Sequence, residues 1–246
     1  MRLDGRRALV TGAARGIGLA ATTALAEAGA HVTLCDLSEP HLTEAVAALN
    51  GKGLAVEGLL VDVTDVARFR QAVEATEPFD VFMNNAGTNR PADFIDVSVK
   101  DFDFVMNLNV RASFFAAQAV ARQMIAAGRR GSIIITSSTM GKVGMPSRAV
   151  YCATKWAVEG YSRCMAIELA PLGIRVNTLC PTFVETPMTK PFFENAAFKN
   201  AILPKIKLGR IGKLEDLTGA ILFLAGDASA MMTGSSLVID GGWTAE

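Results

Sequence analysis

The chain has 246 residues, of which 24 are basic and 24 acidic, and half of its residues are hydrophobic. This length suits one large α/β domain, and the balanced charge lacks the basic excess typical of proteins that bind nucleic acid or an anionic membrane. The four cysteines form no CxxC pair and the two histidines have no ligand-like spacing, which argues against a disulfide framework or a metal site. Because the sequence shows no apolar signal-like segment and no run of 18 apolar residues, we expect a cytoplasmic protein.

Short apolar segments alternate with longer amphipathic segments along the whole chain. We expect strands at 7–11, 31–36, 54–62, 80–84, 132–137, 175–180 and 236–239, and helices at 16–29, 39–50, 65–76, 101–127, 151–172 and 214–225. The strands are almost continuously apolar, as in a parallel sheet whose two faces are both covered by helices. The pattern predicts a Rossmann-type doubly wound α/β fold with a seven-stranded parallel sheet, in which residues 1–246 form a single domain.

Residues 181–212 interrupt this alternation. The segment contains Pro181, three further prolines and four phenylalanines, at positions 183, 192, 193 and 198. A long insertion after the carboxyl end of a parallel strand is where ligands bind in such sheets. We therefore expect 181–212 to be a substrate loop that folds over the ligand and excludes water. The phenylalanines are equally compatible with a core and with a subunit interface.

A glycine-rich segment, Thr11-Gly12-Ala13-Ala14-Arg15-Gly16-Ile17-Gly18, separates the first expected strand from the first expected helix. Glycines let the backbone approach a pyrophosphate closely, and the first N–H groups of the helix point toward the anion. The order of strand, glycine loop and helix favours a dinucleotide site over an ordinary glycine turn. The expected contacts in this segment are Gly12, Arg15, Gly16, Ile17 and Gly18.

Asp36 ends the second expected strand, 18 residues after Gly18. A carboxylate at this place can accept hydrogen bonds from both ribose hydroxyls and repels a 2′-phosphate. Leu37 follows, where a basic residue would be expected in a protein that prefers NADP. The sequence therefore predicts NAD as the cofactor. Arg15 is the counter-argument, because a basic residue in the glycine loop could reach a 2′-phosphate.

Tyr151 and Lys155 stand four residues apart in an expected helix and therefore share one face of it. A free tyrosine has a pKa of about 10, so it can act as a base near neutrality only if a nearby ammonium stabilises its phenolate. Ser138 stands at the carboxyl end of an expected strand, where its hydroxyl can bind a substrate oxygen. Asn109 is a polar residue inside an expected helix, where it could hold a water molecule, bend the helix or be a satisfied core residue.

Together these motifs make the chain resemble the short-chain dehydrogenase/reductase family over essentially its full length. The resemblance rests on the TGxxxGxG loop at 11–18, the turn Asn84-Asn85-Ala86-Gly87, and a catalytic tetrad of Asn109, Ser138, Tyr151 and Lys155. It implies that a hydride moves between nicotinamide and a carbon-bound oxygen, with Tyr151 as proton donor and acceptor. It also implies that Ser138 orients the carbonyl, that Lys155 lowers the tyrosine pKa and binds the ribose, and that Asn109 holds a relay water.

The same resemblance implies further contacts to the cofactor. They are Asp62 and Val63 near the adenine, and Asn85, Ala86, Gly87, Pro181, Val184 and Thr186 nearer the nicotinamide. One position departs from the family pattern, because Thr182 stands where relatives usually have glycine, and threonine resists a positive φ. The ending Asp240-Gly241-Gly242 also resembles the family, which implies a homotetramer.

Arg148 stands three residues before Tyr151 and is the main clue to the substrate. A guanidinium can bind a carboxylate through two parallel hydrogen bonds, although a surface arginine would look the same in sequence. The region around Tyr151 and the chain ending resemble the branch that contains 3-hydroxybutyrate-type and 2-keto-3-deoxy sugar acid (fuconate or rhamnonate) dehydrogenases. We expect a small hydroxy or keto acid, held by Arg148 with Ser138 and Tyr151. Further candidates for the pocket are Lys190, Lys199, Glu185, Asn89 and Arg90.

Three other functions are compatible with parts of this pattern. An NADPH-dependent ketone or 3-oxoacyl reductase would share the tetrad, but Asp36 disfavours NADPH and Arg148 disfavours a steroid substrate. A dinucleotide sensor without catalysis would not need the four tetrad residues. An epimerase or dehydratase of the longer branch would need a larger substrate domain than 246 residues leave.

Overall fold

Seven parallel strands form one sheet in the computed structural model, which describes residues 1–187 and 189–245. The strands are β1 (Arg7–Thr11), β2 (His31–Asp36), β3 (Val56–Leu60), β4 (Val81–Asn84), β5 (Ser132–Thr136), β6 (Arg175–Pro181) and β7 (Ser236–Ile239). Their order across the sheet is β3-β2-β1-β4-β5-β6-β7. The connections change direction between β1 and β4, and in open α/β sheets ligands bind at such a switch point. The predicted doubly wound fold is confirmed.

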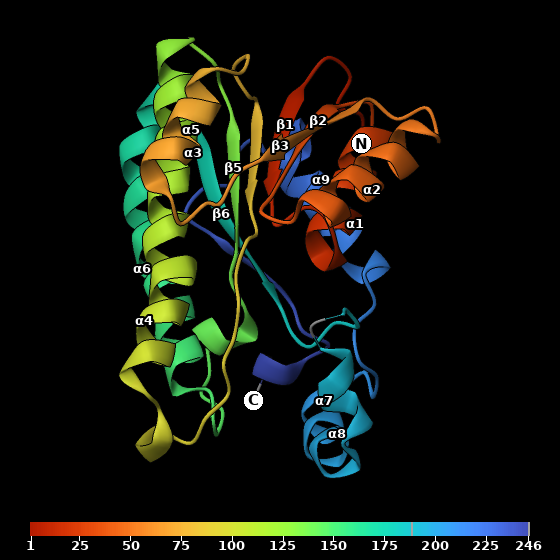
Figure 1. The fold of residues 1–246 in the computed structure, drawn as a ribbon, viewed down its shortest axis with the longest axis vertical. Helices are drawn as coiled ribbons and strands as arrows, with labels where there is room; N and C mark the ends of the chain where they lie inside the picture. The colour runs from red at the N-terminus through yellow and green to blue at the C-terminus, as the bar shows by residue number, and fades with distance from the viewer. Residues whose placement is uncertain (188, 246) are drawn as a thin grey trace.

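Helices cover both faces of the sheet (Figure 1). One face carries α1 (Gly16–Glu27), α2 (Glu39–Asn50) and α9 (Glu215–Ala225), and the other carries α3 (Val66–Glu74), α5 (Ser113–Ala126) and α6 (Ala149–Leu169). Successive residues of β1 point to opposite faces, so Val10 joins the core under α1 and α9 while Leu9 joins the core under α5 and α6. No helix among the described residues is both long and apolar enough to cross a membrane.

The helix expected at 101–127 is built differently from the prediction. It consists of α4 (Val99–Met106), a π-helical segment η2 (Asn107–Ala112) and α5. The first helix begins at Val99 because the Ser98 hydroxyl accepts a hydrogen bond from the Asp101 amide at 3.1 Å, which caps the N-terminus. A π-helical turn inserted into an α-helix often marks a functional site, and here it contains Asn109.

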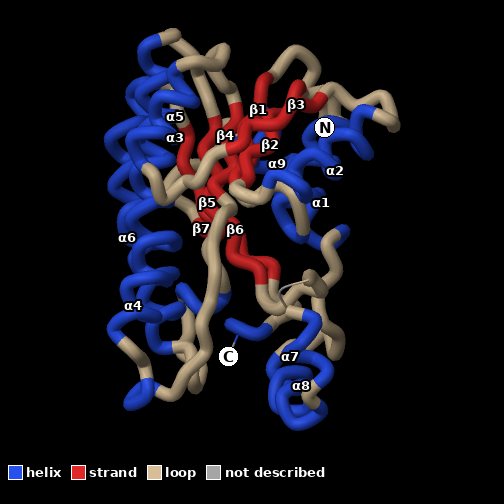
Figure 2. The backbone as a smooth tube through the Cα atoms, viewed as in Figure 1, coloured by secondary structure: helices blue, strands red, loops and turns tan. Residues whose placement is uncertain are grey.

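The segment 181–212 contains two short helices, α7 (Lys190–Glu194) and α8 (Ala196–Ile202), which lie beyond the end of the sheet (Figure 2). Its two ends are joined, because the Glu185 amide donates to the Gly212 carbonyl at 2.9 Å. All four phenylalanines of the segment make ring contacts within the chain, and the Phe183 ring also lies 5.9 Å from that of Trp243. The segment is therefore a small folded layer with its own apolar contacts.

The turn between β1 and α1 requires glycine for two different reasons. Gly12 and Gly16 have φ values of +61° and +57°, a left-handed conformation that side chains disfavour. Gly18 has ordinary helical geometry, but a Cβ built on it would lie 2.1 Å from the carbonyl oxygen of Gly12. The helix therefore packs directly on the loop that precedes it.

We predict that Gly18→Ala destabilises the protein by about 1–3 kcal/mol, since the added methyl group forces the loop away from α1. A matched control is Gly219→Ala, in helix α9, where a Cβ would meet nothing within 4 Å. That substitution should be neutral or stabilise by up to about 1 kcal/mol, because alanine favours a helix. Chemical denaturation of both variants measures the difference, and equal unfolding free energies would contradict the close-packing argument.

Candidate active site

A long cavity of about 350 Å³ opens at the carboxyl ends of the strands on both sides of the switch point. It runs from Asp36, at the end of β2, to Arg148, at the start of α6. Most of the predicted cofactor residues line it: Gly12, Arg15, Gly16, Ile17, Asp36, Leu37, Val63, Asn85, Ala86, Gly87, Tyr151, Lys155, Pro181, Val184 and Thr186. The fold thus brings residues from six separate segments of the sequence around one elongated space.

The glycine loop fits a dinucleotide pyrophosphate. Helix α1 begins after Arg15 without a side-chain cap, so its first N–H groups remain available to an anion. A Cβ on Gly12 would lie 3.0 Å from the Ala86 Cα, and one on Gly16 would lie 3.6 Å from the Thr186 side chain. Gly12 is therefore packed closely on the loop after β4, whereas a Cβ on Gly16 would make only an ordinary contact with Thr186.

The Asp36 carboxylate is held in place by the backbone around it. One oxygen accepts a hydrogen bond from the Ala14 amide and the other from the Ser38 amide, both at 3.1 Å. Ser38 and His41 also line the cavity, and the Ser38 hydroxyl lies 2.8 Å from the His41 ring. The sequence analysis missed these two residues, although their positions at the start of α2, directly after the carboxylate, would have indicated them.

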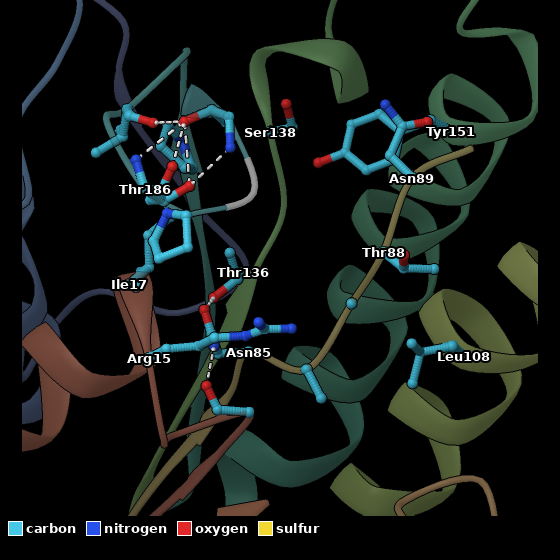
Figure 3. Close-up of a pocket in the computed structure, with 18 of the residues that line it drawn as sticks. Arg15, Ile17, Asn85, Thr88, Asn89, Leu108, Thr136, Ser138, Tyr151 and Thr186 are labelled. Carbon is cyan, nitrogen blue, oxygen red and sulfur yellow. Dashed lines mark hydrogen bonds between the residues drawn. The ribbon is translucent and has the colours of Figure 1, made fainter. Parts of the chain in front are cut away.

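The end of β4 is tied to the end of β1. The Thr11 hydroxyl accepts hydrogen bonds from the backbone amides of Asn85 and Ala86, at 3.0 and 3.1 Å, and the Asn85 side chain donates to the Thr11 carbonyl at 3.1 Å. These bonds hold the two strands at the switch point at a fixed spacing. They shape the floor of the cavity, where Asn85 and Thr136 meet (Figure 3).

Asn109 does not line the cavity. Its side chain, in η2, accepts a hydrogen bond from the Thr88 amide and donates one to the Thr88 carbonyl, both at 2.8 Å. It also donates to the Thr154 hydroxyl at 3.2 Å. Asn109 thereby joins the loop after β4 to helix α6, while its neighbour Leu108 faces the cavity.

Ser138, Tyr151 and Lys155 meet at the wide end of the cavity, where Ser138 and Tyr151 project into the same space (Figure 3). Ser138 caps a short 3₁₀ helix, η3 (Thr139–Gly141), by accepting a hydrogen bond from the Met140 amide at 3.1 Å. The Lys155 ammonium donates to the carbonyl oxygen of Thr136 at 2.8 Å and lies 5.5 Å from the centroid of the Tyr151 ring. The arrangement places a phenol, a hydroxyl and an ammonium on one side of the cavity.

Burial dominates the protonation of both titratable groups. It raises the pKa of Tyr151 to about 12, against a smaller opposing effect of the Ser138 hydroxyl. It lowers the pKa of Lys155 to about 8, with the Glu159 carboxylate among the groups that oppose the decrease. In the chain alone the phenol is therefore protonated at neutral pH and can donate a proton. To accept one, it needs additional positive charge beside it, from the Lys155 ammonium and from an oxidised nicotinamide.

Arg148 is a buried cation that has no acidic partner among the described residues. Its residue is 6% exposed, and its guanidinium donates to the Ser147 carbonyl at 3.1 Å and lies 5.2 Å from the centroid of the Phe192 ring. Of the described residues, no acidic side chain lies within ion-pair distance of it. Burial lowers the pKa of this guanidinium. A buried charge without an acidic partner in the described part of the chain is suited to an anionic ligand.

Several other predicted residues lie elsewhere. Gly18 is packed under the glycine loop, and the exposed Asp62 carboxylate accepts a hydrogen bond from the Thr64 amide at 2.8 Å, while its neighbour Val63 faces the cavity. Lys190, Lys199 and Glu185 do not line the cavity. Arg90 pairs with Asp101 and lies over the Phe104 ring, whereas Asn89 does line the cavity.

The remaining wall consists of residues that the sequence analysis did not assign to the site, chiefly Thr88, Met140, Met145, Phe192 and Thr189. Thr182, which stands where relatives usually have glycine, also lines the cavity. Its φ is not positive, because Ser147 is the one described non-glycine residue with a positive φ. The backbone at this position therefore accommodates a threonine. In the described part of the chain, no group of three or more His, Cys, Asp or Glu side chains could hold a metal ion.

Comparisons with known proteins agree with this geometry. Residues 12–244 match the family model described as Enoyl-(Acyl carrier protein) reductase. The chain is 39% identical to L-xylulose reductase of Bos taurus over 245 residues, covering 100% of this chain and 99% of that protein. It is 40% identical to the 3-oxoacyl-[acyl-carrier-protein] reductase of Thermotoga maritima over 246 residues, covering 98% of this chain and 99% of that protein.

Among solved structures, a gluconate 5-dehydrogenase from Burkholderia cenocepacia, in complex with NADP and tartrate, superposes with a TM-score of 0.96. It is 37% identical in sequence, and the match covers 100% of this chain and 97% of that one. With near-complete coverage by the family model and by these relatives, and with the glycine loop, Ser138, Tyr151 and Lys155 gathered around one cavity, the chain belongs to the short-chain dehydrogenase/reductase family.

Proposed function

We propose that the chain is an NAD-dependent dehydrogenase that interconverts a secondary alcohol and a ketone on a small hydroxy acid or deoxy sugar acid. Its family membership makes it an oxidoreductase that acts on a CH–OH group with a nicotinamide dinucleotide. One observation carries the choice of an acid. The Arg148 guanidinium is buried in the cavity that holds Ser138 and Tyr151, and no described acidic side chain pairs with it.

The residues around the cavity divide the chemistry among them. A bound nicotinamide supplies or accepts the hydride. The Ser138 hydroxyl is placed to donate a hydrogen bond to the substrate oxygen, and Tyr151 is placed to give that oxygen a proton in reduction and to remove it in oxidation. The Lys155 ammonium uses one hydrogen bond to hold Thr136, which leaves two donors for the cofactor ribose and for stabilising a phenolate.

We predict that Tyr151→Phe lowers kcat/KM by about 10²–10⁴-fold, because it removes the acid/base while preserving the ring. The Kd for NADH, measured by fluorescence titration, should change by less than about threefold, since the dinucleotide contacts remain. A variant that keeps wild-type turnover would disprove the proposed mechanism. A wild-type chain that binds neither NADH nor NADPH would contradict both this mechanism and the alternative of a dinucleotide sensor.

The substrate assignment is supported by charge at the wide end of the cavity. Arg148 is a buried cation there, in addition to Lys155, and the related gluconate 5-dehydrogenase was solved with tartrate, a hydroxy dicarboxylate. Lys190 and Lys199 belong to α7 and α8 of the segment 181–212, and we propose that they assist when this segment closes over the substrate. A suitable panel contains 3-hydroxybutyrate, gluconate, tartrate and the neutral sugar xylulose, each tested with both cofactors.

We predict that Arg148→Met raises KM for the acids of this panel by about 10-fold or more, because the bidentate contact to the carboxylate is lost. Arg148→Lys should recover part of the affinity, since a lysine keeps the charge but not the fork geometry. KM for xylulose serves as the control and should change little. An equal increase for acids and for the neutral sugar would remove the carboxylate contact from the proposal.

The preference for NAD is supported by the Asp36 carboxylate, whose two oxygens are fixed at the far end of the cavity. Its negative charge disfavours a 2′-phosphate. Arg15, Ser38 and His41 line the same end and offer polar contacts to such a phosphate, and the related gluconate 5-dehydrogenase was solved with NADP. The preference between the two cofactors therefore depends chiefly on the charge of the Asp36 carboxylate.

We predict that the wild-type chain has a higher kcat/KM with NAD⁺ than with NADP⁺, and that Asp36→Asn reduces this ratio by about 10-fold or more. Asparagine keeps a hydrogen-bond acceptor for the backbone but removes the repelling charge. Adding Arg15→Ala to this variant should weaken NADP⁺ use again. A wild-type ratio that favours NADP⁺ would overturn the proposed preference and would favour an NADPH-dependent ketone or 3-oxoacyl reductase instead.

We also propose, from the resemblance of the chain ending to the family, that the protein is a homotetramer in the cytoplasm.

A further inference from the structure

A second charged cluster lies on helix α6 directly behind the catalytic residues. Glu159 stands one turn after Lys155 and is only 4% exposed. It accepts a hydrogen bond from the Lys142 ammonium at 2.7 Å, from the Ser236 hydroxyl and, at 3.2 Å, from the Cys180 thiol. Burial alone would raise the pKa of Glu159, but hydrogen bonds, those from Lys142 and Ser236 foremost, lower it to about 2, so the carboxylate is charged near neutral pH.

This carboxylate joins four parts of the fold. Glu159 itself belongs to α6, Cys180 to β6 and Ser236 to β7, while Lys142 directly follows η3. The Lys142 ammonium also donates to the Ser236 hydroxyl at 2.8 Å, so Glu159, Lys142 and Ser236 form a closed network. Lys142 thus connects the end of η3 to both the helix and the edge strand of the sheet.

The short helix η3 is packed tightly against the same turn of α6. A Cβ added to Gly141 would lie 3.1 Å from the Glu159 side chain and 3.1 Å from the Lys155 carbonyl oxygen. Ser138 caps the beginning of η3, and Lys142 follows its end. The close contacts at Gly141 and the Lys142–Glu159 ion pair therefore hold the end of η3 on the helix that carries Tyr151 and Lys155. Ser138, at the beginning of η3, is bound within the segment to the Met140 amide.

We propose that the Lys142–Glu159 ion pair is a positioning device that fixes the Ser138 hydroxyl relative to the Tyr151 phenol. The inference rests on the proposed function, because it assigns the pair a role in the reaction of Ser138 and Tyr151. A buried ion pair is often no more stabilising than an apolar pair of similar size, so stability alone does not account for two charges at this place. A pair that bridges η3 and α6 sets the spacing of the two elements, and this spacing decides whether both hydroxyls reach the same substrate oxygen.

The test is a mutant cycle that combines removal of the pair with removal of the Ser138 hydroxyl. The double variant Lys142→Met/Glu159→Gln removes both charges at once, which avoids leaving one buried charge unpaired. With Ser138 present, it should lower kcat by about 10-fold or more for the substrate of the panel that the wild-type chain turns over fastest. The Kd for NADH should stay within about threefold of the wild-type value.

In the Ser138→Ala background, the same double variant should lower kcat by less than about twofold, because the hydroxyl that the pair positions is already absent. Equal reductions in both backgrounds, or no reduction with Ser138 present, would overturn the inference. The single variant Lys142→Arg should retain much of the wild-type kcat, since it keeps the ion pair with Glu159. These outcomes are independent of the test of Tyr151→Phe, whose failure would instead disprove the proposed function.

A matched control distinguishes positioning from a general loss of stability. Asp80 is also buried, and it pairs with Arg129 at 3.2 Å and accepts the Arg7 amide at 2.9 Å, near the amino end of the sheet. The double variant Arg129→Met/Asp80→Asn should lower the unfolding free energy without changing kcat. If it lowers kcat as much as removal of the Lys142–Glu159 pair does, the effect is one of stability and the positioning role is excluded.

Discussion

The contact between the Lys155 ammonium and the Thr136 carbonyl oxygen is the interaction on which the site depends. It joins helix α6 to the carboxyl end of β5 at 2.8 Å, two residues before Ser138. Tyr151 lies one turn earlier on the same helix, so the contact also determines how far the phenol reaches over the sheet. A fully buried ammonium needs such an acceptor, because an unpaired charge in the interior would lose its proton or expose itself to water.

The two ends of the cavity carry opposite charges, which favours one orientation of a bound ligand. Asp36, held by two backbone amides, lies at one end, and the buried guanidinium of Arg148 lies at the other. The free N–H groups of α1 lie between them. A nicotinamide dinucleotide would match this order of charges, with its ribose hydroxyls at Asp36 and its phosphates at α1. An anionic second molecule would then lie beside Arg148. The same order would let a dinucleotide and the proposed carboxylate substrate share one cavity without repelling each other.

Buried polar groups around α6 hold this helix in place against the neighbouring elements of the fold. Asn109 ties α6 to the loop after β4 through Thr88 and Thr154, and the Lys142–Glu159 pair ties it to η3 and the edge of the sheet. Asn109 uses its amide oxygen and both amide N–H groups, and Glu159 accepts hydrogen bonds at both carboxylate oxygens. Polar groups satisfied in this way make an interior rigid. Tyr151 and Lys155 therefore stand on a helix that is fixed from both sides.

The sequence by itself determined the sheet, its glycine loop and the candidates Ser138, Tyr151, Lys155 and Asp36, because each depends on local information: apolar runs, a strand followed by glycines, and residues one helical turn apart. Only the tertiary structure decided what depends on packing between distant segments. The π-helical segment around Asn109, the placement of Phe192 beside Arg148 and the pairing of Lys142 with Glu159 all join residues with no mutual signal in the sequence. Such contacts follow from how helices settle on the sheet, which the spacing of residues along the chain does not specify.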